Sequence, residues 1–434
     1  MRYHSILGVI TLAGLTAHAQ ALPLIDTPDT HVSVEGLAAY GLFDSRKRYD
    51  GGEGGKHWRE GFIKYGLKGD TRMADAGTLY GAFALVSSAT WGDGDAGGFT
   101  DGSERTTKIE DAYLGWRSAD LFPAFGQDGV DFSFGRQVYK VGRGFLINDD
   151  GPNLGKGVAD GSLNRGGAYY LGARHAFDRT AVLRLGGEQG WHGSAAWLKS
   201  DNRAQAEPEL SVVDLQYTQP IGTLAATWIH GLDVSRRFAS EFQQRRDGMN
   251  VYGLRAEGNA GIDNASFAAE YALQDAQGDQ ARAWYLEAGY RFADLLWAPT
   301  LTARYTRYGQ NWDSLLTGYS TGYGTWFQGE VAANYAGPFN SNTAVSHLGL
   351  KANPLEALTL GVLFFDFRTL GDRQVRNLDG RELDLFAEWA VSPHLIVTPL
   401  IGLYRPERSA ADGGSQSGGN GTNLYSQLTV AVPF

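Results

Sequence analysis

The chain has 434 residues, a formal net charge of -10 and no cysteine, which excludes disulfide frameworks, thiol nucleophiles and cysteine-bound zinc. The negative charge argues against nucleic acid as a partner, since such binding draws on an excess of positive charge. Its 59 glycines, 12% aromatic content and mean hydropathy of -0.29 are typical of strands and turns with little continuous apolar sequence, and they favour a β-barrel.

The N-terminal residues have the three parts of a secretory signal. Arg2 supplies positive charge, residues 6–15 form a short apolar stretch, and Ala17-His18-Ala19 offers a small-residue cleavage site. The apolar stretch is too short for a membrane-spanning helix, which needs about 20 apolar residues. We therefore expect a signal peptide at 1–19 and a single barrel domain at 20–434.

A polar loop at 93–104 follows part of the calcium-loop pattern. Carboxylates stand at the first, third, ninth and twelfth positions, and a glycine at the sixth. The fifth position is also glycine, and no helices flank the loop, so a flexible Gly/Asp loop is the alternative. Calcium in an outer loop is the one cofactor that the sequence suggests. Its ligands would be Asp93, Asp95, Asp101 and Glu104.

Arg136 breaks the alternation of the strand that precedes it. Val130, Phe132 and Phe134 would face outward, and strict alternation would turn Arg136 outward too. An arginine facing lipid at mid-depth costs roughly 2 to 4 kcal/mol. We expect either a bulge at Gly135 that redirects the side chain or a position outside the hydrocarbon.

Period-two alternation marks the strands. In 284–292, the residues Trp284, Leu286, Ala288, Tyr290 and Phe292 form one face, and Tyr285, Glu287, Gly289 and Arg291 form the other. A lipid-facing wall and a watery lumen produce this pattern.

Long polar stretches between strands indicate outer loops, and one of them carries Arg236, Arg237, Arg245 and Arg246. That group contacts anionic lipopolysaccharide, captures polyanionic solute, or is merely a solvated loop.

A first list of strand-like segments does not fit a barrel with an even strand number and strands that run alternately up and down. Two of these alternating segments therefore have to be reassigned. Residues 168–186 fit best as one long tilted strand, with Arg174 and Arg184 toward the lumen and Leu171 and Ala173 outside. Residues 326–336 then fall inside the loop at 310–343 and fold over or into the barrel mouth. The count becomes about eighteen strands.

The last residues alternate as well. Leu428, Val430, Val432 and the terminal Phe434 share one face. This ending resembles the C-terminal signal that the outer-membrane assembly machinery recognises. Together with the export signal, it predicts an all-β transmembrane antiparallel barrel in the outer membrane of a Gram-negative bacterium, with outer-membrane lipid, lipopolysaccharide and the assembly machinery as partners.

Two groups of motifs resemble the alginate export family of outer-membrane porins. The first consists of Trp326-Phe327-Gln328-Gly329-Glu330, Asn340-Ser341-Asn342 and His347-Leu348-Gly349-Leu350-Lys351, followed by Pro354 and a strand to Phe367. The second consists of Glu110-Asp111-Ala112-Tyr113-Leu114 and Phe134-Gly135-Arg136-Gln137. The resemblance covers about a third of the chain. It implies an eighteen-strand barrel with an arginine-lined constriction for a polyuronate.

Alternation places a set of charged side chains on the lumen face. They either form mutually neutralising ladders between strands or leave some arginines unpaired to select anions. The candidate channel-lining residues are Arg117, Arg174, Arg184, Arg255, Arg291, Arg304, Lys351, Arg368, Asp111 and Glu287.

No catalytic pattern accompanies these residues. The nine histidines are scattered, and none lies near a Gly-x-Ser-x-Gly sequence, so we expect no enzyme; a loop-based enzyme or adhesin is the third class. The sequence predicts a passive channel for anionic polysaccharide or uronate-type solutes, with a general or small-substrate diffusion porin as the alternative.

Overall fold

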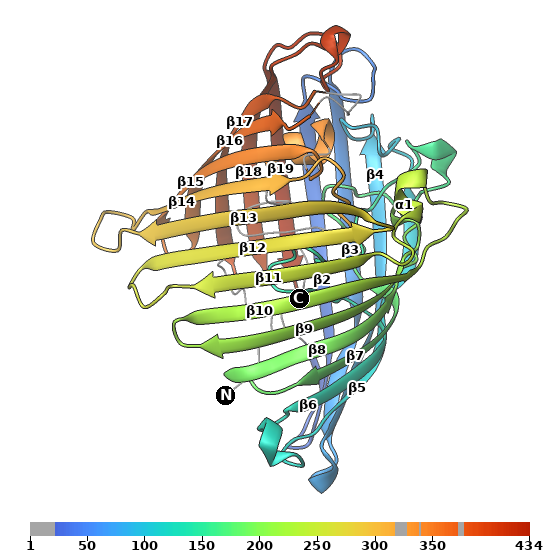
Figure 1. Cartoon of the computed structure of the whole chain (residues 1–434), viewed down its shortest axis with the longest axis vertical. Helices are drawn as coiled ribbons and strands as arrows, with labels where there is room; N and C mark the ends of the chain where they lie inside the picture. The colour runs from blue at the N-terminus through green and yellow to red at the C-terminus, as the bar shows by residue number, and fades with distance from the viewer. Residues whose placement is uncertain (1–21, 317–327, 338–339, 372–376) are drawn as a thin grey trace.

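The computed structural model describes residues 22–316, 328–337, 340–371 and 377–434, so the predicted signal peptide lies outside the described part of the chain. These residues form nineteen antiparallel strands in one sheet (Figure 1). The strands are β1 (Leu22–Asp26), β2 (Thr30–Ser45), β3 (Lys56–Arg72), β4 (Thr78–Gly92), β5 (Arg105–Arg117), β6 (Val130–Gln137), β7 (Phe177–Leu185), β8 (Gly190–Lys199), β9 (Glu209–Gln219), β10 (Gly222–Asp233), β11 (Asn250–Gly258), β12 (Ala265–Ala276), β13 (Asp279–Arg291), β14 (Thr300–Tyr308), β15 (Thr343–Leu355), β16 (Leu358–Thr369), β17 (Gly380–Ser392), β18 (Leu395–Pro406) and β19 (Asn423–Pro433). One helix, α1 (Glu241–Gln244), and helical turns at Ala74–Ala76, Pro123–Phe125, Ala159–Gly161, Arg203–Gln205, Ala332–Ala336 and Ala410–Asp412 lie in the links.

The sheet closes because its last strand pairs with its second. β19 runs antiparallel to β2, from Tyr425 opposite Ser45 to Pro433 opposite Leu37. Strands β2–β19 thus form a closed barrel of eighteen strands, which confirms the predicted architecture. β1 is an additional strand that pairs with the first residues of β2.

The links between strands are long at one end of the barrel and short at the other. Short links include 220–221 and 393–394, while 138–176 and 309–342 are the longest at the opposite end. Bacterial barrels have short periplasmic turns and longer extracellular loops. We therefore call the end with the long links the outer end.

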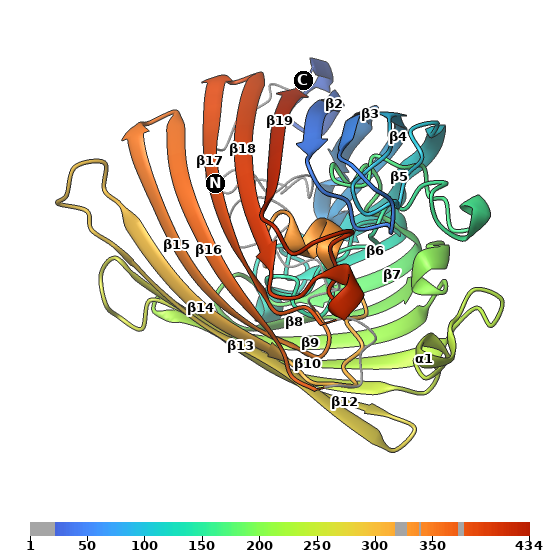
Figure 2. The same ribbon diagram turned by 90° about the horizontal axis from the view of Figure 1, so that it is seen from above.

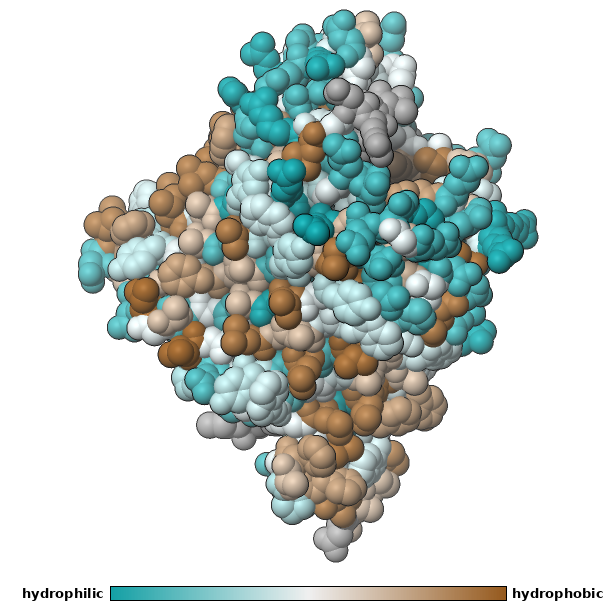
Figure 3. Space-filling model, in the orientation of Figure 1, coloured by the Kyte–Doolittle hydropathy of each residue, from teal (hydrophilic) through white to brown (hydrophobic). Residues whose placement is uncertain are grey.

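Side chains alternate across the wall. On β13, Leu286 is 57% exposed on the outside, whereas Tyr285 is fully buried inside. Figure 3 shows hydrophobic side chains gathered over the strands and hydrophilic ones toward the upper right, where Figure 1 shows the outer loops. The closed sheet pairs the backbone groups of neighbouring strands, and the apolar belt suits the hydrocarbon around it; both features place this chain in an outer membrane. Among the described residues, no helix is long and apolar enough to cross a membrane.

The predicted strand at 168–186 is wrong in its first half. β7 begins only at Phe177, and residues 168–176 end a segment that folds back inside the barrel. Leu171 and Ala173, expected to face lipid, are buried in an interior cluster. The error has a physical cause. Alternation shows that one face of a segment is in apolar surroundings, but it does not show whether lipid or the protein interior provides those surroundings.

The other reassignment is confirmed for the residues that the structure describes. Residues 328–337 lie within the link between β14 and β15, and Val331, Ala332 and Ala336 are fully buried. The bulge expected beside Arg136 is also present. Gly135 has a φ of +119°, the β6–β7 register shifts between Gly135 and Gln137, and Arg136 points inward at 8% exposure.

Candidate functional site

The barrel interior is narrowed by two segments that enter from the outer end. We call them the β6–β7 segment (138–176) and the β14–β15 segment (309–342, described except at 317–327 and 338–339). In Figure 2 the described parts of both lie within the ring of strands. Phe145 of the first segment packs against Tyr285 and Tyr308 of the wall, with ring centroids 5.1 and 5.6 Å apart. Ile147 forms a parallel bridge with Leu316, which joins the two segments.

Glu287 and Arg304 were predicted to line the lumen, and they form one polar group there. Arg304 on β14 lies 3.0 Å from Glu287 on β13. Arg143 of the β6–β7 segment binds the other carboxylate oxygen of Glu287 at 3.0 Å and lies 3.8 Å from Glu257. Sequence alternation missed Arg143, because a residue in a link has no assigned face.

Arg255 also faces the lumen, as predicted, but its side chain is only 1% exposed. Its guanidinium lies 3.6 Å from Asp214 and 3.5 Å from Glu257. A Cβ at Gly142 would stand 2.4 Å from the guanidinium carbon of Arg255. Because glycine has no side chain, the backbone of the β6–β7 segment can pass at Gly142 directly over the Arg255 guanidinium.

A second polar group anchors the other end of the β6–β7 segment. Its centre is Asp201, in the link between β8 and β9. The carboxylate of Asp201 contacts three guanidiniums, those of Arg136 at 2.9 Å, Arg174 at 3.0 Å and Arg165 at 3.4 Å. Arg174 was predicted on a strand, but it lies in the segment. All three arginines are nearly buried, so they hold the segment to the wall and are not free to meet a solute.

Two carboxylates of this group have opposite pKa shifts. Burial raises the pKa of Asp150 to about 7, although Arg165 lies 3.0 Å away. Burial alone would also raise the pKa of Asp201, but the guanidiniums of Arg165, Arg174 and Arg136 together lower it to about 2. Asp201 is therefore the ionised centre of the group at neutral pH.

Asp111 lies on the lumen face as predicted, 2.6 Å from Lys64. The β4–β5 register shifts beside it, so the preceding Glu110 is also turned inward and is buried. Glu110 accepts hydrogen bonds from the backbone N–H groups of His175 and Ala176, at 2.6 and 2.8 Å. Alternation along the strand does not predict this second inward carboxylate, because a bulge interrupts the alternation.

The remaining predicted lining residues are spread along the wall. Arg117 lies over the Tyr80 ring at 4.7 Å, and Lys351 over the Phe386 ring at 5.7 Å. Arg184 lies 3.8 Å from Asp131. Arg291 is exposed at the last position of β13, at the end of the barrel with the short links.

The lumen assignment of Arg368 is wrong. On β16 the buried inward residues are Leu363, Phe365 and Phe367, so Arg368 shares the outward face with Asp366. Arg368 pairs there with Asp366 at 2.8 Å and with Glu407 at 2.6 Å. Aromatic residues take the inward positions because the β14–β15 segment covers this part of the wall.

The β14–β15 segment is held by carboxylates and hydroxyls of the interior. Glu382 on β17 accepts the backbone N–H groups of Val331 and Ala332, both at 2.7 Å. Tyr170 donates to Glu330 at 2.7 Å and accepts from Gln427 on β19 at 2.7 Å. Both inserted segments are thereby tied to each other and to the wall.

The calcium loop is not supported by the geometry. The Asp95 carboxylate accepts the backbone N–H groups of Gly97 and Thr100, and that of Glu104 accepts those of Asp101 and Lys156. Asp93 and Asp101 each accept a backbone N–H as well. In the described part of the chain, no three His, Asp or Glu side chains are grouped to hold a metal ion.

The four arginines predicted to cluster in one outer loop do not stay together in the structure. Arg246 turns inward and pairs with Asp313 at 2.7 Å, nearly buried. Arg245 pairs with Asp279 at 3.1 Å. Arg237 lies over the Phe238 ring at 5.2 Å. The four side chains therefore do not form one surface for lipopolysaccharide.

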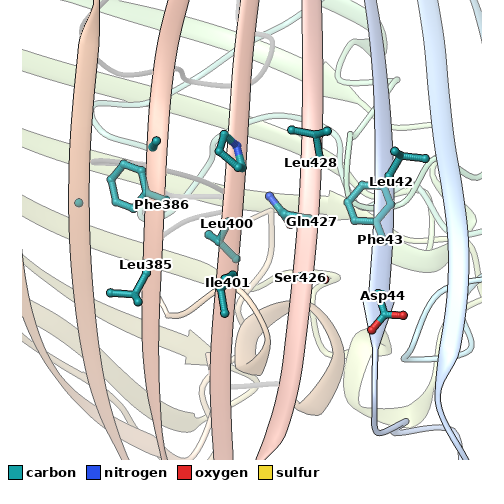
Figure 4. A pocket seen from close by; sticks show the side chains of 13 residues that line it. Leu42, Phe43, Asp44, Leu385, Phe386, Leu400, Ile401, Ser426, Gln427 and Leu428 are labelled. Carbon is teal, nitrogen blue, oxygen red and sulfur yellow. The ribbon is translucent and has the colours of Figure 1, made fainter. Parts of the chain in front are cut away.

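A mostly apolar pocket lies on the wall where the barrel closes (Figure 4). Its lining comes chiefly from β17, β18, β19 and β2, and Asp44 is its one charged residue. Leu385, Ile401 and Leu428 are exposed there on the outward face. The pocket offers few polar groups to a solute, so the charged interior remains the candidate site.

No protein-family model matches the sequence, and no curated protein matches it either. Solved structures do match the fold. OccK11 (OpdR) of Pseudomonas aeruginosa aligns with a TM-score of 0.55 at 13% identity, over 92% of this chain and 96% of that one. OccAB1 of Acinetobacter baumannii aligns with a TM-score of 0.57 at 10% identity, over 96% and 99%. A BenF-like porin from Pseudomonas fluorescens Pf-5 aligns with a TM-score of 0.58 at 9% identity, over 93% and 98%. The chain therefore has the fold of these outer-membrane barrels, whereas membership of the alginate export family finds no support in them.

Proposed function

We propose that this protein is an outer-membrane diffusion channel for small solutes. The observation that carries the proposal is a closed eighteen-strand barrel whose lumen holds two long segments fixed by ion pairs and hydrogen bonds. Segments of this kind reduce a wide barrel to a narrow polar path. The porin named among the structures of similar fold supports the same function.

The size of the solute follows from where the segments lie. β13 is seven strands from β6 in the closed sheet, yet the β6–β7 segment reaches Glu287 on β13. The segment therefore crosses the lumen and packs on both sides of it. A path divided in this way favours small solutes over a polysaccharide chain.

The charges of the lumen do not favour anionic polymers. Arg174, Arg255 and Arg304 each have a carboxylate within 3.6 Å, and Arg184 has one at 3.8 Å. Paired arginines add little net positive potential to a channel. The proposal consequently includes neither alginate nor uronate specificity.

Two measurements on the purified protein test the proposal. Swelling of proteoliposomes should be rapid with monosaccharides and amino acids, and it should fall steeply with oligosaccharides of three or more units. Single channels in planar bilayers should conduct, with a weak charge preference in a salt gradient. Oligouronates that enter as fast as the monomer, or the absence of any conductance, would refute the proposal.

A further inference from the structure

A pocket of about 510 Å³ lies at the outer ends of β12, β13 and β14. It is separate from the lumen. Two arginines and two aromatic residues define it, together with amides from the start of the β14–β15 segment. These residues are Tyr271, Arg282, Trp284, Arg307, Gln310 and Asn311.

Both arginines project from the outside of the barrel. Arg282, Trp284 and Leu286 alternate with the buried Ala283 and Tyr285, so Arg282 shares the lipid-facing side of β13. On β14, Arg307 is likewise exposed beyond Tyr305. Arg307 stands opposite Trp284 in the β13–β14 register, and Arg282 is the next outward residue of β13 beyond Trp284. The two guanidiniums therefore arise from neighbouring positions on one face.

The depth of this pair follows from the length of the strand. The outward alternation of β13 runs to Phe292, ten positions after Arg282. Ten residues of a strand span about 34 Å, and a tilt of about 40° reduces this to about 26 Å along the membrane normal. The apolar band of an outer-membrane barrel is about 25 Å tall. Arg282 and Arg307 thus stand at the outer edge of the hydrocarbon, where lipid headgroups begin.

The protein itself supplies no counter-charge at this place. In the described residues, neither Arg282 nor Arg307 forms an ion pair. Asp279 is engaged by Arg245 at 3.1 Å, and Asp275 accepts the backbone N–H of Gly278 at 3.3 Å. Neither carboxylate lines the pocket. Two adjacent positive charges without a partner repel each other, and an anion from outside the chain would relieve the repulsion.

Two aromatic side chains, Tyr271 and Trp284, line the pocket beside the arginines. The ring centroid of Trp284 lies 5.3 Å from that of Tyr305, which is outside the pocket on the same face. Aromatic side chains of this kind occupy the interface between hydrocarbon and headgroups. The combination fits a molecule with an apolar body and an anionic head better than it fits a free ion.

We propose that this pocket binds the phosphate of a phosphorylated glycolipid of the outer leaflet. Arg282 and Arg307 donate paired hydrogen bonds to the phosphate oxygens, which guanidinium geometry favours. The sugar that carries the phosphate lies against Gln310 and Asn311, and the acyl chains continue down the apolar face below Trp284.

The test uses the full-length mature barrel in phosphatidylcholine vesicles that contain a few per cent of fluorescent lipid A. Energy transfer from tryptophan reports binding. The double variant Arg282→Gln/Arg307→Gln should weaken binding about tenfold or more, and Arg282→Lys/Arg307→Lys should keep part of it. Arg179→Gln is the matched control, because Arg179 is also exposed and outward but already contacts Asp178 at 3.3 Å.

Two further arms separate lipid from free phosphate. Lipid A whose phosphates have been removed should bind the unmodified protein as weakly as phosphorylated lipid A binds the double variant. Inorganic phosphate should not displace the lipid. Equal binding by the double variant or by dephosphorylated lipid A, or displacement of the lipid by competing inorganic phosphate, would overturn the proposal. Heat-modifiable migration on gels shows that each variant is folded.

Discussion

Arg143 in the β6–β7 segment and Glu287 on the barrel wall form an ion pair, with 3.0 Å between Nη1 and Oε1. The pair joins a segment that leaves β6 to a strand seven places away in the closed sheet. It therefore fixes the segment across the lumen, in the path that a solute would take.

Replacing Arg143 by Gln should increase single-channel conductance and shift the reversal potential toward cations. The substitution loosens the segment and removes a positive charge from beside Glu257 and Glu287. Planar bilayer recordings in a salt gradient measure both effects. Arg105→Gln is the control, since Arg105 lies outside the lumen over Trp91. If neither quantity changes, the segment is not part of the permeation path.

Replacing Arg165 by Leu should unfold the β6–β7 segment locally while the barrel stays closed. Asp150 has no exposed side-chain surface, and it would lose the guanidinium that lies 3.0 Å away. An unpaired buried charge costs about 3 to 5 kcal/mol. Limited proteolysis with mass spectrometry should then find new cleavage within 138–176.

The control for that experiment is Arg381→Ala, because Arg381 is largely exposed in its contact with Asp366 and such pairs contribute about 0 to 1 kcal/mol. Adding Asp150→Leu to the first variant removes the buried charge as well and should restore part of the protection. Unchanged cleavage in Arg165→Leu would show that the pair does not hold the segment.

Acidification should release the same segment within a defined pH range. The pKa of Asp201 is lowered to about 2, below its ordinary value of about 3.9, so its ionised form stabilises the folded segment. That contribution is complete above about pH 4 and is lost as the pH falls toward 2. The protection of 138–176 against hydrogen exchange, taken relative to the intrinsic exchange rate at each pH, should therefore be lower at pH 2.5 than at pH 5.

Two comparisons make this prediction specific. Asp201→Asn should be poorly protected at pH 5 already, with little further change at pH 2.5. Asp150 acts in the opposite direction, since its raised pKa of about 7 means that the segment gains stability as the pH falls from 7 toward 4. Protection that declines steadily from pH 7 to pH 4 would contradict both assignments.

Closure of the barrel should depend on Gly36 and Phe434. Their backbones exchange two hydrogen bonds, at 2.7 and 2.9 Å. A Cβ at Gly36 would lie 2.1 Å from the Phe434 ring, so Gly36→Val and deletion of Phe434 should each sharply lower the yield of folded protein in the outer membrane. Gly187→Ala is the control, because a Cβ there meets no atom within 4 Å. Normal yields of heat-modifiable barrel from both variants would count against this role of the terminal strand.

The membrane barrel itself was predictable from the sequence. Alternation in β13 and β19 depends on neighbouring residues of one strand, and it appears in the printed sequence whatever the rest of the chain does. An even strand number and strand direction were enough to exclude 326–336 from the wall. Glycine before Arg136 likewise indicated a bulge, because only a local break in the pleat could turn that charge inward.

Tertiary structure decided the composition of the lumen. Leu171 and Ala173 alternate as a lipid-facing strand would, but the apolar surroundings that they require are provided by the inside of the barrel. Arg174 and Arg304 look equally free in the sequence, and each has a carboxylate partner that comes from a different strand or link. Which charges cancel depends on the register across strands and on where inserted segments lie. Those are set by barrel closure between residues hundreds of positions apart, and no pattern along a single strand records them.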